Sequence, residues 1–83
     1  MNEAKKIHQA WLLMDNRMVR YGCVFGLVDN DPKLDIATSP VVEYEIPSDN
    51  SYVIVKTRSG STYHIVEPDN NFLKDLLKYM GDR

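Results

Sequence analysis

The sequence predicts an α+β protein in which a small antiparallel sheet of four or five strands, arranged as a meander, lies between an N-terminal and a C-terminal helix. Two observations predict the sheet: apolar and polar residues alternate in several short segments, and turn residues separate these segments. A third observation predicts the helices, because apolar residues near both ends of the chain recur at spacings of three and four. The length of 83 residues fits a single domain over 1–83.

The N-terminal helix is predicted from a stripe of apolar side chains near the start of the chain. The stripe consists of Ala4, Ile7, Trp11, Met14 and Met18. These spacings place the five side chains on one face of a helix that ends between residues 14 and 21. We expect that face to pack against the sheet.

The strands of the meander follow from a change of period. From Val19 onward apolar residues alternate, which predicts a strand over about 21–28, and a short strand at 34–38 follows after a loop. Pro40 lacks a backbone donor, so we expect it on a sheet edge or at a kink before the next strand, over 41–46.

The firmest local prediction is a hairpin near the end of the sheet. The segments Tyr52–Thr57 and Thr62–Val66 are rich in β-branched and aromatic residues, which favour strands. Between them, Ser59 and Gly60 fit a two-residue loop, because glycine accepts the positive φ that such turns require.

The C-terminal helix has a start signal, an apolar face and a stop. The segment Pro68-Asp69-Asn70-Asn71 is a helix start in which an Asp or Asn side chain can cap free backbone amides, and Gly81 marks the end. The apolar face comprises Phe72, Leu73, Leu76, Leu77 and Met80.

The composition bounds the class of protein. An apolar fraction of 43% and a charged fraction of 27% are typical of a globular domain, and the formal charge of −2 is too mild to name a partner. The single cysteine, Cys23, cannot form an internal disulfide, which favours a cytoplasmic location. No segment approaches the roughly 18 apolar residues of a membrane span, so we expect no membrane contact.

The sequence offers no constellation for catalysis, so we predict a protein that is not an enzyme. His8 and His64 belong to no recognisable catalytic motif. The segment 29–35 resembles the opening of a calcium loop, but Leu34 replaces the required glycine and Pro40 the closing glutamate. We therefore expect no catalytic residue, no metal and no cofactor.

The charge is uneven along the chain, because residues 23–51 carry six acids against one lysine. This segment favours a non-enzymatic protein–protein interaction module that binds a larger partner with a basic surface. Solvated loops and strand edges are the simpler interpretation of the same acids. The predicted partner-binding residues are Asp29, Asp31, Asp35, Glu43, Tyr44, Glu45 and Tyr52.

Two other functions stay open. A single-stranded nucleic-acid-binding protein would combine cations with an aromatic stacking platform. Its candidate residues are Arg17, Arg20, Tyr52, Lys56 and Arg58. A homo-oligomeric structural protein is the other alternative, because a small sheet has exposed strand edges that pair readily with a second copy as a homodimer.

Part of the chain resembles small, uncharacterised proteins encoded by phages and prophages. The resemblance rests on Thr38-Ser39-Pro40-Val41, a T-S-x-V strand, and on Thr57-Arg58-Ser59-Gly60-Ser61-Thr62-Tyr63, a T-R-S-G-S-x-Y hairpin. It covers roughly residues 21–66. It implies a small sheet domain of mobile-element origin and, by analogy, an inhibitor of a host defence system such as an anti-CRISPR protein.

Overall fold

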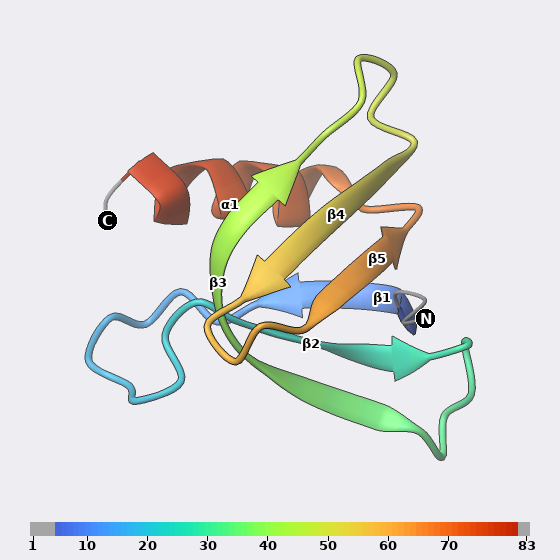
Figure 1. The fold of residues 1–83 in the computed structure, drawn as a ribbon, viewed down its shortest axis with the longest axis horizontal. Helices are drawn as coiled ribbons and strands as arrows, with labels where there is room; N and C mark the ends of the chain where they lie inside the picture. Colours follow the sequence, from blue (N-terminus) through green and yellow to red (C-terminus); the bar gives the residue numbers. More distant parts are fainter. Residues whose placement is uncertain (1–4, 82–83) are drawn as a thin grey trace.

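The structure, a computed structural model, describes residues 5–81 and contains five strands followed by one helix (Figure 1). The strands form a closed barrel in chain order. Their bounds are β1 Lys5–Leu12, β2 Cys23–Val28, β3 Asp35–Glu45, β4 Tyr52–Thr57 and β5 Thr62–Val66, and the helix is α1 Asn70–Gly81. The antiparallel meander and the C-terminal helix are confirmed, whereas the predicted N-terminal helix is wrong.

The odd number of strands explains why the pair that closes the barrel is parallel. The four successive pairs from β1 to β5 are antiparallel, and the closing pair of β1 with β5 is parallel. In a ring where each strand reverses the last, an odd number of strands forces one parallel pair. That pair is short, with Lys5 opposite Tyr63 and Ile7 opposite Ile65.

The segment predicted as the N-terminal helix is β1, and a β-bulge explains the error. Three steps along β1, from His8 to Trp11, match only two steps along β2, so β1 carries one extra residue. The inward side chains are therefore Ile7, Ala10 and Leu12, which are buried. The bulge turns a spacing of two into a spacing of three, which imitates a helix. Ala4 of the predicted stripe lies outside the described residues.

β3 is one bent strand where the sequence predicts two. Its first half pairs with β2 and its second half with β4, and the register shifts on both sides of Pro40. The Pro40 carbonyl accepts a hydrogen bond from the Arg58 amide at 2.9 Å. Pro40 thus lies at the bend where β3 changes partners, in agreement with the predicted kink.

The β4–β5 hairpin is confirmed, with a longer loop than predicted. The Gly60 amide donates to the Thr57 carbonyl at 2.9 Å, and Gly60 has a φ of +91°. The Thr57 amide donates to the Ser61 carbonyl, also at 2.9 Å. These bonds describe a turn followed by a glycine bulge rather than a two-residue loop.

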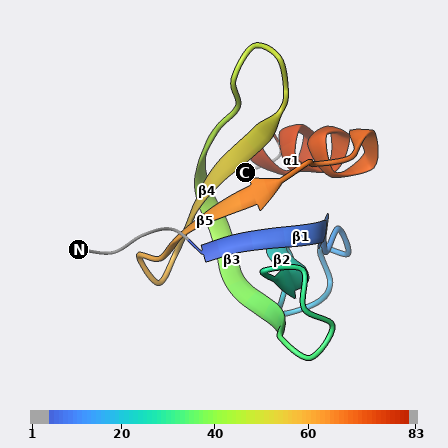
Figure 2. The same ribbon diagram turned by 90° about the vertical axis from the view of Figure 1, so that its right-hand side faces the viewer.

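α1 lies along one side of the barrel and completes its core (Figure 2). The Asp69 carboxylate caps the helix by accepting from the Phe72 amide at 2.7 Å, as the start signal predicts. Phe72, Leu76 and Tyr79 are buried in one cluster with the interior of the barrel, and the helix packs mainly against β1. Leu77, predicted on the apolar face, is half-exposed.

Tyr79 ties α1 to the barrel, although the predicted apolar face does not include it. Its hydroxyl donates to the Val41 carbonyl at 2.9 Å, and its ring packs edge-on against Tyr21. Gly22, with a φ of +85°, leaves room for the ring, because a Cβ there would lie 2.3 Å from it. The contact fixes the helix against the bend of β3.

Candidate partner-binding surface

The acids predicted as one patch lie at the two ends of β3. Asp35 is its first residue and Glu45 its last, ten steps apart. A straight strand of that length spans about 33 Å, and even a bent one crosses most of a molecule whose extents are 29 × 29 × 25 Å. A partner must therefore cover most of the length of the molecule to meet both groups of acids.

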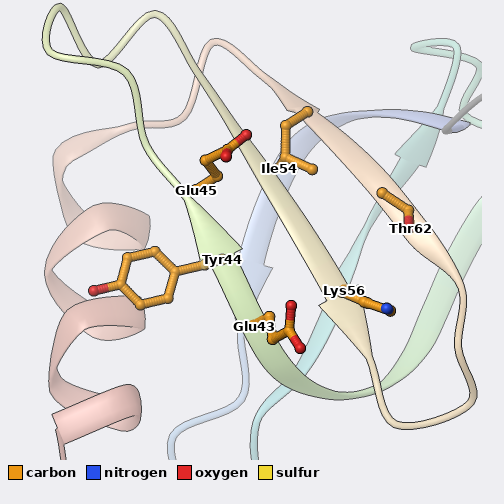
Figure 3. Close-up of a pocket in the computed structure, with 6 residues that line it drawn as sticks. All are labelled: Glu43, Tyr44, Glu45, Ile54, Lys56 and Thr62. Carbon is orange, nitrogen blue, oxygen red and sulfur yellow. The ribbon is translucent and has the colours of Figure 1, made fainter.

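The group at the end of β3 lies beside a cation. Glu43 pairs across the strands with Lys56, and Glu45 pairs with Ile54. Figure 3 shows these four side chains on the outer face of the sheet, whereas Tyr44 points away from them. Lys56 offsets part of the acidic charge here. Tyr44 lines the same hollow as these side chains, although its ring points away from them. We call the four residues Glu43, Glu45, Ile54 and Lys56 the β3–β4 face.

The candidate nucleic-acid-binding residues also lie in two separate places, at opposite ends of β4. Tyr52 begins β4 and contacts His64, with ring centroids 5.0 Å apart. Arg58 lies in the turn after the far end of β4, where its amide donates to the Pro40 carbonyl. Pro40 pairs with Cys23, whose amide donates to the Arg20 carbonyl, so Arg20 and Arg58 lie at the same end of the barrel. The structure brings Arg20 and Arg58 together and leaves the stacking platform at the opposite end of the strand.

Arg17 has a partner within its own loop. Its guanidinium forms an ion pair with the Asp15 carboxylate at 3.0 Å, and this contact holds the pKa of that carboxyl below its usual value. The same carboxylate accepts from the Arg17 amide. The loop between β1 and β2 is thereby ordered, and part of its positive charge is neutralised.

Cys23 is a buried, free thiol rather than a nucleophile. Only 3% of its surface is exposed, and burial raises the pKa of the thiol despite the nearby arginines. Within residues 5–81, no group of three side chains is arranged to hold a metal ion. Neither His8 nor His64 is hydrogen-bonded to a nucleophile among the contacts of this part of the chain.

An exposed aromatic pair, absent from the predicted site, lies on the outer face of β1 and β2. Trp11 and Phe25 face each other across the two strands, with ring centroids 4.4 Å apart and an angle of 13° between the rings. Trp11 is nevertheless 52% exposed. Large aromatic side chains held rigidly at a surface are typical anchors of protein interfaces. We call Trp11 and Phe25 the aromatic ledge.

Two hollows border the ledge, and Gln9 and Trp11 line both. The β3-side hollow has a volume of 360 Å³, and its other lining residues include Phe25, Leu27 and Asp35. The α1-side hollow has a volume of 580 Å³. Its other lining residues include His8, Asn30, Glu67 and Asp69. With histidine counted as neutral, every charged residue in the two linings is a carboxylate.

The backbone of the α1-side hollow is strained. Gln9, Asn30 and Glu67 have φ values of +52°, +59° and +48°, in the left-handed region that side chains other than asparagine rarely adopt. The Gln9 amide group donates to the Asn30 side-chain oxygen at 3.4 Å, which joins β1 to the β2–β3 turn. Gln9 and Glu67, the two residues for which this conformation is costly, make the α1-side hollow a candidate site.

The predicted acids of the β2–β3 turn lie at this surface. Asp35 lines the β3-side hollow, and Asp29 and Asp31 flank Asn30 of the α1-side hollow. Trp11 was missed because its spacing from Ile7 and Met14 assigned it to a helical stripe facing the core, whereas the bulge in β1 turns it outward. The available signal was its type, since a lone tryptophan beside an expected acidic surface is a candidate anchor.

Comparisons with protein families, with curated proteins and with solved structures find no match to this chain. Over residues 5–81, no helix has the length and apolarity to cross a membrane.

Proposed function

We propose that this chain is a non-enzymatic protein–protein interaction module that binds a larger partner with a basic surface through the aromatic ledge. One observation carries the proposal: Trp11, half-exposed, is stacked on Phe25 between two hollows whose charged residues are acidic. When a partner covers apolar surface that is still exposed after folding, the free energy of the complex falls. The carboxylates then select partners of opposite charge.

The ledge suits a docking role because its parts are held in place before binding. Trp11 and Phe25 project from paired strands, and the adjoining Gln9 and Asn30 side chains are bonded to each other. A rigid anchor loses little conformational entropy when a partner docks. The β3–β4 face is the alternative contact, since Glu43 and Glu45 were also predicted to bind the partner.

A capture experiment separates the two faces. The tagged chain, Trp11→Ala, and the double variant Glu43→Gln with Glu45→Gln are exposed to a nuclease-treated bacterial lysate, and bound proteins are quantified by mass spectrometry. We expect a stoichiometric partner that the wild type and the glutamine variant retain and Trp11→Ala loses. Loss in the glutamine variant alone would move the interface to the β3–β4 face. Capture that none of the variants alters would reject the proposal.

Nucleic-acid binding is a second candidate because Arg20 and Arg58 lie at the same end of the barrel, beside the paired residues Cys23 and Pro40. Its affinity for an oligonucleotide would fall steeply with salt, as counterions are released from phosphates. Arg20→Gln and Arg58→Gln would each reduce that slope, whereas Tyr52→Ala, at the other end of β4, would leave it unchanged. A salt-independent signal would remove this candidate.

The remaining predictions of function concern assembly and origin. Self-association was expected through exposed strand edges, but the five described strands close into a barrel, so a dimer would use an outer face such as the ledge. It would then appear by light scattering as a dimer that Trp11→Ala converts to a monomer. Inhibition of a host defence system, which the resemblance to phage proteins implies, stays a prediction. Identification of the captured partner would test it.

A further inference from the structure

We infer that the aromatic ledge recognises arginine or lysine side chains of an extended segment that crosses Trp11, with a cation in each hollow. The inference rests on the proposed function and names the chemistry that the ledge selects. It follows from the position of Trp11 between the two acidic hollows.

The first step concerns the indole. An aromatic face attracts a cation placed over it, and tryptophan does so more strongly than tyrosine or phenylalanine. Phe25 stacks on Trp11 at 4.4 Å and holds the ring, while 52% of the Trp11 surface stays open to a ligand. A guanidinium group fits this surface better than an ammonium group, because it is planar and less strongly hydrated.

The second step concerns charge. Asp35 lies in the β3-side hollow, and Glu67 and Asp69 lie in the α1-side hollow. One oxygen of Asp69 accepts from the Phe72 amide, so Asp35 and Glu67 are the carboxylates best placed to meet an incoming cation. Among residues 5–81, no lysine or arginine lines either hollow, in contrast to the β3–β4 face, where Lys56 pairs with Glu43.

The third step concerns shape. The two hollows meet at Gln9 and Trp11, so a ligand that enters both must pass over these two residues. Side chains of an extended segment point alternately to its two sides, and two residues apart they return to the same side about 7 Å along the chain. An extended segment with arginines two residues apart therefore presents two cations toward the protein, one for each hollow.

The experiment uses the single tryptophan of the chain as its reporter. Trp11 fluorescence is titrated with a short peptide that carries two arginines two residues apart, and with matched peptides that carry lysine or uncharged citrulline instead. We expect saturable binding with the order arginine, lysine, citrulline. The citrulline peptide should bind at least about tenfold more weakly than the arginine peptide, since it loses both charge and cation–π attraction.

Charge variants test the hollows. Asp35→Asn and Glu67→Gln should each lower the affinity for the arginine peptide about threefold, as expected for partly exposed ion pairs. Asp75→Asn, which removes a carboxylate of α1 that lines neither hollow, should leave the affinity unchanged. Trp11→Phe removes the reporter, so its binding is followed by anisotropy of a labelled peptide and should be several-fold weaker.

The outcomes separate this inference from the proposed function. Equal affinity for the arginine and citrulline peptides would overturn cation recognition. Peptides that fail to bind, together with Trp11-dependent capture of a partner, would overturn the inference and leave the proposed function standing. Absence of both signals would reject both.

Discussion

The aromatic ledge and the β3–β4 face are both outer surfaces of the barrel that carry acids, yet they differ in charge balance and in backbone. On the β3–β4 face, Lys56 lies opposite Glu43 in the register of two paired strands. Around the ledge, carboxylates have no cation in the hollow linings, and the strand that carries Trp11 is bulged. The position of an acid in the sheet, more than its neighbours in the sequence, therefore decides whether its charge can interact with a partner.

The largest expected effect concerns the glycine beneath the ledge. A Cβ at Gly26 would lie 2.4 Å from the Ile7 side chain and 2.9 Å from the His8 carbonyl oxygen, so Gly26→Ala forces β1 and β2 apart. We expect a loss of about 3 kcal/mol in the free energy of unfolding, measured with urea. Gly81→Ala is the matched control, because nothing lies within 4 Å of a Cβ there. Similar losses in both variants would contradict the close packing of β1 on β2 under the ledge.

A smaller effect tests whether the ledge acts as a unit. Trp11→Ala, Phe25→Ala and the double variant form a cycle whose coupling measures the stacked pair, and we expect about 1 kcal/mol in unfolding free energy. Tyr52 and His64 form the matched pair near the β3–β4 face, with a tilted contact at 5.0 Å. Their coupling should be weaker. Additive losses for Trp11 and Phe25 would mean that the ledge is two independent side chains.

Backbone strain near the ledge predicts that replacing a glutamate by glycine stabilises the protein there and destabilises it on the β3–β4 face. Glu67 has a φ of +48°, which glycine adopts freely, so Glu67→Gly should raise the free energy of unfolding by about 0.5–1 kcal/mol. Glu45 ends a regular strand, and Glu45→Gly should lower it by a similar amount. The same Glu67→Gly variant should bind the arginine peptide more weakly. If Glu67→Gly instead lowers the free energy of unfolding, contacts of the Glu67 side chain outweigh the cost of its positive φ.

The fold was predictable where local signals and tertiary structure agree. The β4–β5 segments are dense in β-branched residues with Gly60 between them, and Asp69 precedes an amphipathic helix, so both elements were found. β1 was not, because its bulge sets inward apolar residues three apart, and that spacing on its own is also typical of a helix. The helical spacing from Ile7 to Ala10 is a result of that bulge.

The candidate site was predictable in part for the same reason. Asp35 belongs to the acidic segment and reaches the β3-side hollow. Trp11 and Glu67 meet in the α1-side hollow only because β1 pairs with its neighbouring strands and the chain after β5 turns toward α1. The length of β3 also separates Asp35 from Glu45, which the sequence placed in one patch. Long-range pairing, which no local pattern encodes, sets both outcomes.

The smallest expected effect concerns a third region, the end of the barrel where Arg20 and Arg58 approach Cys23. Burial raises the pKa of the Cys23 thiol above its value in the unfolded chain, and the two arginines partly oppose this. Well below an unfolded pKa of about 8.5, both states are protonated and the thiol adds no pH dependence. As the pH rises through that value toward the folded pKa, the unfolded chain ionises first, so stability falls.

The measurement compares the wild type with Cys23→Ala in urea at pH 7 and at pH 10. Lysines and tyrosines titrate in both proteins, so the difference between the two pH dependences isolates the thiol. We expect the wild type to lose more stability than Cys23→Ala on going to pH 10. Arg20→Gln should enlarge that loss, because it removes a charge that favours the thiolate, whereas Lys74→Gln on α1 should not. An unchanged loss in Arg20→Gln would mean that the arginine does not reach the thiol, and the proximity on which the nucleic-acid alternative depends would fall with it.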